Sequence, residues 1–131
     1  MLLKTENIQV TSIVGRYLEH ARIYVFGRGD QAKYFIASAD LMTRNLQRRV
    51  EIACPVIDPA VRRQIKHYVE LFCADNVKAR NLCVDGTYAP VGRPEGAPAL
   101  DAQATLMAEA LQEASSTQAV PAAQERRPGL L

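Results

Sequence analysis

Cysteine is scarce in this sequence and long apolar runs are absent. The 131 residues include three cysteines, an odd number that is too small for a secreted disulfide scaffold and that favours a reducing, cytoplasmic setting. The opening MLLKTENIQV places Lys4 and Glu6 directly after two leucines, so it lacks the apolar core of a signal peptide. No apolar run approaches the ~20 residues of a membrane span, and we expect no integral membrane segment.

Nucleotide-loop and metal motifs are also missing. The sequence has neither a Walker phosphate loop nor a glycine-rich dinucleotide fingerprint. Its cysteines lack Cys-x-x-Cys spacing and His67 falls on a helical pattern, so we predict no metal site built from this chain. The net charge of +2 is modest, and no basic run is interleaved with aromatic residues. Nucleic acid is therefore not an expected partner.

What is present changes along the chain. Five of the seven prolines fall at position 90 or later, where alanine also becomes common. We predict an ordered core over residues 1–92, then a loop and one alanine-rich helix within residues 93–114. The remaining segment, 115–131, has little to bury and is predicted to be a disordered tail.

Apolar patterning indicates an α/β fold. NIQVTSIV reads as a short strand, HARIYVF and KYFIAS as a hairpin around a glycine-bearing loop, and VEIACPVI as a further strand. Asp58 can cap a helix whose first residue is Pro59, and a second helix is predicted over 102–113. The apolar faces of these two helices are predicted to contain Val61, Ile65, Tyr68, Val69 and Phe72 in the first, and Leu106, Ala110 and Leu111 in the second.

The predicted helices are too few for the predicted sheet. Both faces of the hairpin strands are apolar, which is typical of a mixed sheet with flanking helices on both sides. Two helices leave an apolar face open, and soluble monomers seldom show one that large. We therefore expect an incomplete part of a larger domain, which docks against missing upstream domains or another copy of itself.

Two groups of side chains are candidates for chemistry. His20 stands just before a strand, two residues ahead of Arg22, and an imidazole can attack phosphorus or donate a proton near neutral pH. Most histidines are not catalytic, and the alternative is an ordinary surface histidine at the entrance of a strand. The second group follows the strand KYFIAS, where α/β sheets place ligands, and it can also be a solvated turn in which Asp40 caps a helix. The three arginines of this group carry guanidinium groups whose geometry matches phosphate oxygens. The whole group contains Ser38, Asp40, Arg44, Asn45, Arg48 and Arg49.

Three separate stretches carry a family resemblance. In order, SIVGRYLEHARIYVF, YFIASADLMTRNLQRRVEIACPVIDP and ADNVKAR resemble the C-terminal domain of the larger type of bacterial polyphosphate kinase. The likeness runs from about Glu6 to Tyr88 and continues more loosely to DAQATLMAEALQ. It implies a phospholipase D-like half-domain, one of two similar halves that each place a histidine at a shared cleft.

The resemblance also implies a reaction and a set of site residues. Family members transfer the terminal phosphate of ATP, reversibly and with Mg²⁺, to inorganic polyphosphate through a phosphohistidine that lies outside this chain. His20 matches the family's Leu-Glu-His histidine, which makes it the expected catalytic residue, as an acid or a phosphate donor. The predicted ATP- and phosphate-binding residues are His20, Arg22, Ser38, Asp40, Arg44 and Asn45, and no Mg²⁺ ligand is identifiable.

The chain departs once from the general phospholipase D motif and once from the pattern of the kinases. It has His20-Ala21-Arg22 instead of His-x-Lys, and arginine keeps the charge but does not shuttle protons, which favours anchoring. Leu41 stands where the kinases commonly have tryptophan. We expect half of a phosphoryl-transfer site that is inactive alone. Two alternatives remain: a single-motif phosphodiesterase or nuclease active as a homodimer, and a non-catalytic phosphate-binding or docking module.

Overall fold

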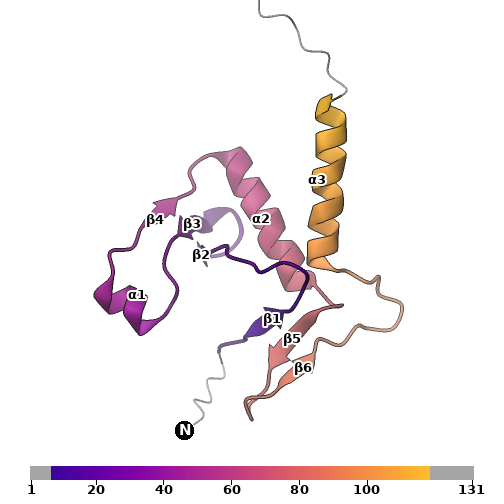
Figure 1. Ribbon diagram of the computed structural model, residues 1–131, viewed down its shortest axis with the longest axis horizontal. Coiled ribbons are helices and arrows are strands. Elements are labelled where there is room, and N and C mark those ends of the chain that lie inside the picture. Colours follow the sequence, from indigo (N-terminus) through magenta and orange to yellow (C-terminus); the bar gives the residue numbers. More distant parts are fainter. Residues whose placement is uncertain (1–6, 119–131) are drawn as a thin grey trace, which may run out of the picture.

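The computed structural model describes residues 7–118, in which two small antiparallel sheets are joined by helices (Figure 1). One sheet has the order β2-β3-β4 and contains β2 (Ile23–Phe26), β3 (Lys33–Ala37) and β4 (Ala53–Pro55). The other has the order β1-β5-β6 and contains β1 (Thr11–Ile13), β5 (Ala79–Leu82) and β6 (Tyr88–Pro90). The helices are α1 (Thr43–Arg48), α2 (Pro59–Ala74) and α3 (Ala102–Gln118), with a 3-10 turn at Gly29–Gln31.

The predicted α/β class, the hairpin and both predicted helices are confirmed, with two differences. The strands form two antiparallel sheets rather than one mixed sheet, because the irregular segment 14–22 carries the chain away from β1, which pairs with β5 instead. Helix α3 continues to Gln118, so the first four residues of the predicted tail 115–131 are helical. Residues 119–131 lie outside the described part of the chain.

Local sequence signals account for the hairpin and for α2. The β2–β3 loop contains Gly27 with a φ of 92°, a conformation that glycine adopts without steric cost. Asp58 caps α2 through its carboxylate, which accepts from Ala60 N at 2.7 Å and Val61 N at 3.0 Å, and Pro59 takes the first helical position. These are the two elements whose start signals were explicit in the sequence.

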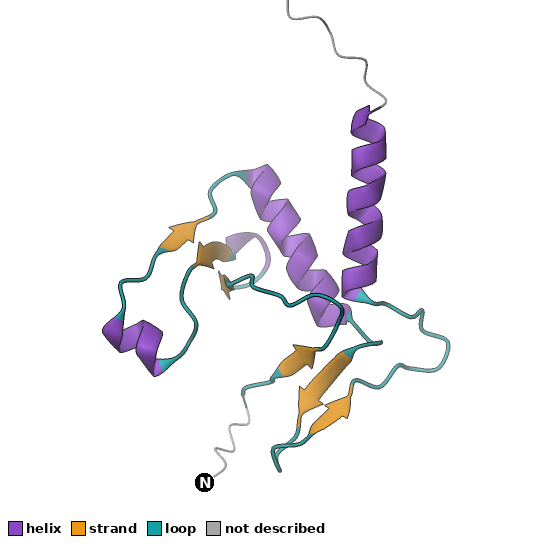
Figure 2. Cartoon of the chain, in the orientation of Figure 1, coloured by secondary structure: helices purple, strands orange, loops and turns teal. Residues whose placement is uncertain are grey.

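Helix α2 lies beside the hairpin sheet (Figure 2), and a small core joins it to one face of that sheet. Its buried members are Ala32, Tyr34, Val56 and Ile65, with Ile23 and Val69 packed beside them. Directly opposed residues in antiparallel strands share a face, so the pair Val25–Tyr34 and the pair Ile23–Ile36 lie on the α2 side.

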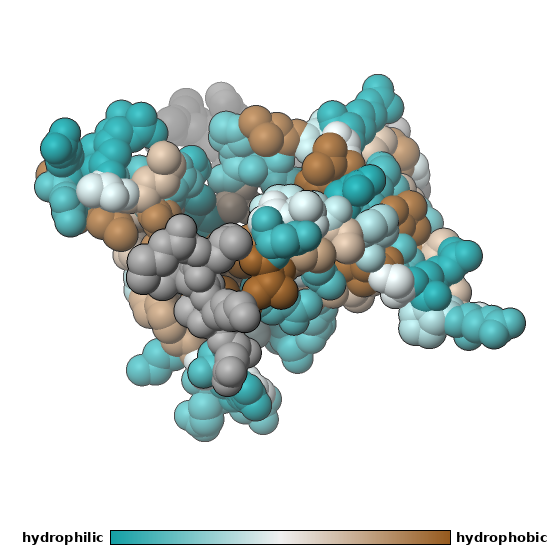
Figure 3. Space-filling model, turned by 90° about the horizontal axis from the view of Figure 1, so that it is seen from below, coloured by the Kyte–Doolittle hydropathy of each residue, from teal (hydrophilic) through white to brown (hydrophobic). Residues whose placement is uncertain are grey.

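The opposite face of this sheet is uncovered among the described residues. It carries the pair Tyr24–Phe35 and Phe26, which is 60% exposed. Phe26 and Phe35 meet edge to face, with ring centroids 5.8 Å apart, and Figure 3 shows apolar side chains reaching the surface between polar ones. The expectation that two helices leave an apolar sheet face open is confirmed.

The second sheet is tied to both long helices by one carboxylate, that of Asp75. Its Oδ1 accepts from the backbone N–H groups of Val77, Lys78 and Ala79 at 2.8–3.0 Å, and its Oδ2 accepts from Ala102 N at 2.8 Å. Asp75 is 2% exposed. Burial opposes its ionisation most strongly, yet the four N–H donors together outweigh that effect and hold the pKa of the carboxyl below its usual range.

Further contacts close the same junction. Asn76 donates from Nδ2 to the Pro98 carbonyl and accepts at Oδ1 from Leu100 N, at 3.0 and 2.9 Å. Lys78 Nζ lies 2.8 Å from Asp101 Oδ2. The end of α2, the start of β5 and the start of α3 therefore form one hydrogen-bonded unit.

Beyond this junction α3 is loosely packed. Of the apolar face predicted for it, Leu106 is half-buried, whereas Ala110 is exposed and Leu111 is 68% exposed. His67 on α2 lies 2.9 Å from a carboxylate oxygen of Glu109 on α3, so its side chain is engaged between the helices. Within residues 7–118 no helix combines the length and apolarity required to cross a membrane.

We predict that Asp75→Ala lowers the free energy of unfolding by about 2–6 kcal/mol, because it leaves the buried N–H groups of Ala79 and Ala102 unpaired and each such group costs ~1–3 kcal/mol. A carboxyl with a depressed folded pKa stabilises above its ordinary value of about 3.9 and ceases to do so as pH falls through the folded value. The free energy of unfolding of the variant should not show this dependence on pH. Urea unfolding from pH 2.5 to 7 measures both effects, with exposed Asp30→Asn as control; equal stability of Asp75→Ala and wild type would contradict the prediction.

Candidate functional site

A polar pocket of about 120 Å³ lies where β2 begins and β3 ends. It is lined by Glu19, His20, Ala21, Arg22 and Asp40. The first four precede β2 and Asp40 follows β3; since these strands are antiparallel neighbours, the start of one meets the end of the other. The pairing thus brings together three of the predicted site residues.

Two of the lining residues, Arg22 and Asp40, form an ion pair. Arg22 donates from Nε to Asp40 Oδ1 at 2.6 Å and from Nη2 to Oδ2 at 3.4 Å. It also donates from Nη1 to the backbone carbonyl of His20 at 3.3 Å. The Arg22 and Asp40 side chains remain 33% and 40% exposed, so the guanidinium is held by its carboxylate and still reaches solvent.

Neighbouring groups stabilise the charged forms of Arg22 and Asp40. The hydrogen bond from Arg22 holds the pKa of Asp40 below its usual range against the opposing effect of desolvation, and the charges of Arg22, Arg44 and His20 add to it. The Asp40 hydrogen bond in turn raises the pKa of Arg22. The pair is therefore fully ionised at neutral pH, and His20 and Arg44 lie near enough for their charges to act on it.

A second carboxylate, Glu51, organises the loop that carries Asp40. Glu51 accepts from Ser38 Oγ and, at Oε1, from Asn45 Nδ2 at 2.8 Å. Ser38 Oγ also accepts from Ile52 N at 3.1 Å. The Ser38 hydrogen bond, then that of Asn45, lowers the pKa of Glu51. Glu51 thereby ties the end of β3 and the buried Asn45 of α1 to the residues before β4.

Comparison with known proteins identifies the family of this chain. Residues 3–103 match the model described as polyphosphate kinase C-terminal domain 2. The chain belongs to the polyphosphate kinase family. A polyphosphate kinase of Bacillus anthracis is 46% identical over 108 residues, which cover 82% of this chain and 15% of that protein. One from Bacillus cereus is 51% identical over 84 residues, covering 64% of this chain and 12% of that protein.

A solved structure agrees with the sequence relatives. The crystal structure of polyphosphate kinase from Porphyromonas gingivalis matches with a TM-score of 0.76 and 37% identity, over 85% of this chain and 17% of that one. The phospholipase D-like α/β fold expected from the resemblance is confirmed by this match. The chain spans only about 12–15% of the length of these two Bacillus polyphosphate kinases.

The predicted site residues of this family member divide into two groups. His20, Arg22 and Asp40 share the pocket, and Arg44 on α1 is exposed with its charge acting on Asp40. Ser38 and Asn45, which were predicted as ATP- and phosphate-binding residues, both donate to Glu51. They point to Glu51 because it lies between them, so their effect on the pocket runs through the loop that holds Asp40.

Glu51 is the site residue that the sequence analysis missed. It lies in VEIACPVI, which reads as a strand, and an acidic residue at the start of a strand has no distinguishing local signal. Its role depends on contacts with Ser38, 13 positions earlier, and Asn45, 6 positions earlier. A search for a carboxylate partner of Asn45, a predicted site residue, would have pointed to Glu51.

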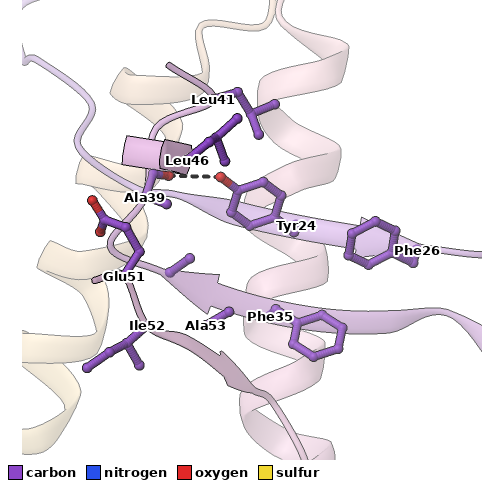
Figure 4. A pocket seen from close by; sticks show the side chains of 10 residues that line it. Tyr24, Phe26, Phe35, Ala39, Leu41, Leu46, Glu51, Ile52 and Ala53 are labelled. Atoms are coloured by element: carbon purple, nitrogen blue, oxygen red, sulfur yellow. Dashed lines mark hydrogen bonds between the residues drawn. The ribbon is translucent and has the colours of Figure 1, made fainter. Parts of the chain in front are cut away.

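An apolar hollow of about 340 Å³ lies beside the polar pocket, on the uncovered sheet face (Figure 4). The aromatic rings of Tyr24, Phe26 and Phe35 line it, with Leu41 and Leu46 along the α1 side. The Tyr24 hydroxyl donates to the Ala39 carbonyl at 2.8 Å, which fixes the ring next to the loop that carries Asp40. Leu41 is 77% exposed.

Metal-binding groups are not clustered in the described chain. Among residues 7–118 no three His, Cys, Asp or Glu side chains gather as a metal site would require. His67, the other histidine, pairs with Glu109, and Cys54, Cys73 and Cys83 are free thiols.

We predict that Glu51→Gln speeds amide exchange at Ser38 and Ile52, because the tie between β3 and β4 loses its charged acceptor. In the wild type this protection is present above the ordinary glutamate pKa of about 4.3 and is lost as pH falls through the lower folded value. The variant should show no such step. Hydrogen exchange read by NMR from pH 3 to 7 measures it, with exposed Glu95→Gln as control; unchanged exchange rates would refute the role of Glu51.

Proposed function

We propose that this chain supplies the His20 side of the phosphoryl-transfer site of a polyphosphate kinase. The reaction moves the terminal phosphate of ATP, reversibly, to inorganic polyphosphate in the cytoplasm. The observation that carries the proposal is the shared pocket of His20, Arg22 and Asp40 in a chain that belongs to the polyphosphate kinase family. An imidazole next to an anchored guanidinium suits a substrate that consists of phosphate groups.

Arg22 would bind phosphate oxygens. Its guanidinium uses part of its donor fork for Asp40 and for the His20 carbonyl, and the exposed remainder is free for a phosphate. Asp40 fixes the plane of the fork in advance, so less side-chain entropy is lost when phosphate binds. Arg44, whose charge acts on Asp40, adds a second positive charge that would attract the two polyanionic substrates.

His20 would handle the proton. In the first step of the proposed reaction, the γ-phosphorus of ATP forms a bond to the ring nitrogen of a histidine outside this chain. The bond between that phosphorus and the ADP oxygen breaks at the same time. A terminal polyphosphate oxygen then attacks that phosphorus and the P–N bond breaks. A proton on the His20 ring stabilises the negative charge that develops on the departing oxygen, as a donor positioned at the pocket.

Mg²⁺ enters this proposal only with the nucleotide. Asp40 is engaged by Arg22 and Glu51 by Ser38 and Asn45, so the described residues offer no free carboxylate cluster for the ion. Mg²⁺ is commonly held by substrate phosphates and water, where it neutralises phosphate charge. No protein ligand from this chain is needed for that role.

The contact between Arg22 and Asp40 counts against the phosphodiesterase alternative. That chemistry uses a lysine two residues after the histidine, and here the position is an arginine whose Nε is committed to a carboxylate at 2.6 Å. An anchored guanidinium binds phosphate and does not exchange protons. The family match of residues 3–103 favours the kinase for the same residues.

We predict that His20→Ala, in an active polyphosphate kinase that carries this sequence, lowers kcat by about 100-fold or more, since positioned acid catalysis contributes ~10²–10⁴-fold. The fold should be unaffected because His20 is exposed. Turnover of ATP into polyphosphate and thermal unfolding are measured together. His67→Ala, which removes the chain's other histidine, is the matched control, and a His20→Ala enzyme with the wild-type rate would make His20 an ordinary surface residue.

We also predict that the purified 131-residue chain does not turn over ATP or polyphosphate, since it holds only one side of the site. It should still bind tripolyphosphate weakly, through Arg22 and Arg44, with affinity that falls as salt rises because the contacts are exposed. Radiolabelled ATP and thin-layer chromatography test turnover, and calorimetry tests binding. Polyphosphate synthesis by the chain alone would show that it contains a whole active site.

A further inference from the structure

The carboxamide of Gln103, in the first turn of α3, grips the backbone just before His20. Tyr17 N donates to Gln103 Oε1 at 3.2 Å, and Gln103 Nε2 donates to the Tyr17 carbonyl at 2.8 Å. Nε2 also donates to Glu19 Oε1 at 2.8 Å. Gln103 is 4% exposed. Its side chain thus pairs with Tyr17 as a neighbouring strand would, although the two residues are 86 positions apart.

Gly15 leaves the space that this grip occupies. A Cβ built on Gly15 would lie 2.1 Å from Gln103 Oε1 and 2.6 Å from its Cδ, far inside van der Waals contact. Gly15 is not among the glycines with positive φ, so an alanine is compatible with the backbone there. The need for glycine at this position comes from the carboxamide of Gln103 and not from backbone strain.

Gln103 itself is held on a rigid base. The preceding residue, Ala102, is fully buried and donates its N–H to Asp75 Oδ2 at 2.8 Å. Asp101 accepts from Ala104 N at 3.1 Å and pairs with Lys78. The start of α3 is therefore fixed to the end of α2 and the start of β5, and the carboxamide projects from a part of the fold that has little freedom.

The segment that Gln103 grips has few other anchors. Tyr17 is 48% exposed and Leu18 83% exposed, and Glu19 and His20 are exposed as well. Its other end is held at Arg22 by Asp40. The Arg22 carbonyl also accepts from Ala37 N at 2.9 Å. Within the described chain, the segment that carries His20 is thus held by Gln103 on one side and by the contacts of Arg22 on the other.

We propose that Gln103 is a positioning residue for His20, and that Gly15 is required to admit it. This inference rests on the proposed phosphoryl-transfer function of His20. Loss of the carboxamide frees Tyr17 and Glu19, so the imidazole samples positions away from the reacting phosphate. Binding through Arg22 and Arg44 continues, since Asp40 holds Arg22 independently. The expected effect is on kcat and not on KM.

The kinetic test uses an active polyphosphate kinase that carries this sequence. Gln103→Met keeps side-chain length and removes the hydrogen bonds, and it should lower kcat by about 10–100-fold, the scale of a ~1 Å misplacement, with the KM for ATP within about threefold. Gln112→Met, exposed on the same helix, is the matched control and should change neither constant. An unchanged kcat for Gln103→Met, or a loss explained wholly by unfolding, overturns the inference.

The link to Gly15 is tested by a double-mutant cycle. Gly15→Ala should lower kcat about as much as Gln103→Met, because the new methyl group displaces the carboxamide. Added to Gln103→Ala, which removes the colliding atoms, it should cost less than about twofold more, since effects on one contact are not additive. Gly92→Ala, where nothing lies within 4 Å of the new Cβ, is the control. Additive losses from Gly15→Ala and Gln103→Ala would overturn the inference.

NMR of the full 131-residue chain separates this inference from the proposed function. The chain has two histidines, so His67 is an internal reference for His20 as tripolyphosphate is added. In Gln103→Met, amide exchange at Tyr17 should be faster by at least about tenfold, because its local hydrogen bond is lost, and the His20 response should weaken. No His20 response in wild type counts against the proposed function. Equal Tyr17 exchange in variant and wild type counts against the inference, whatever the ligand does.

Discussion

The Asp75 carboxylate accepts four backbone N–H groups, one of them from Ala102 at the start of α3. The next residue is Gln103, which bonds both backbone groups of Tyr17, and His20 follows three positions later. The buried carboxylate of Asp75 therefore fixes the start of α3, and the start of α3 positions the carboxamide of Gln103. That carboxamide in turn holds the segment before β2 that carries His20. Because each step is a short hydrogen bond to backbone, little side-chain flexibility enters the path.

The other end of this segment, at Arg22, is held by an ion pair. Arg22 is held by Asp40 at 2.6 Å, and Asp40 belongs to a loop that Glu51 closes through Ser38 and Asn45. Exposed ion pairs add little to the free energy of unfolding, so the value of this one lies in geometry: it sets the direction of a guanidinium fork. The two ends differ in kind, one buried and neutral at the carboxamide, the other exposed and ionic.

The sequence predicted elements whose signals are local. Asp58 capping with Pro59 at the first helical position, and the paired apolar runs around a glycine loop, needed no knowledge of distant residues. The family resemblance placed His20, Arg22 and Asp40 in one set of predicted binding residues, and the pairing of β2 with β3 brings these three into one pocket. Sequence reasoning failed where the determining contact is remote, as between Gln103 and Tyr17.

The second sheet shows the same limit. Strands β5 (ARNL) and β6 (YAP) are short and carry no apolar alternation, so nothing in their composition distinguishes them from a loop. Thr11 on β1 bonds Asn81 at 2.8 Å, and the sheet is stabilised by this pairing and by Asp75 rather than by hydrophobic burial. Such a sheet exists because its ends are fixed by other elements, and that information is not contained in the strands.

The open apolar face bears on how the site would work. Electrostatic stabilisation of a transferring phosphate is weak in water and strong in a site that excludes it, and in the described chain His20 is exposed while Arg22 is one-third exposed. The hollow lined by Tyr24 and Phe35 adjoins the loop of Asp40, so a surface packed into it would also border the polar pocket. A surface that covers the apolar face of the sheet would then also exclude water from the polar pocket.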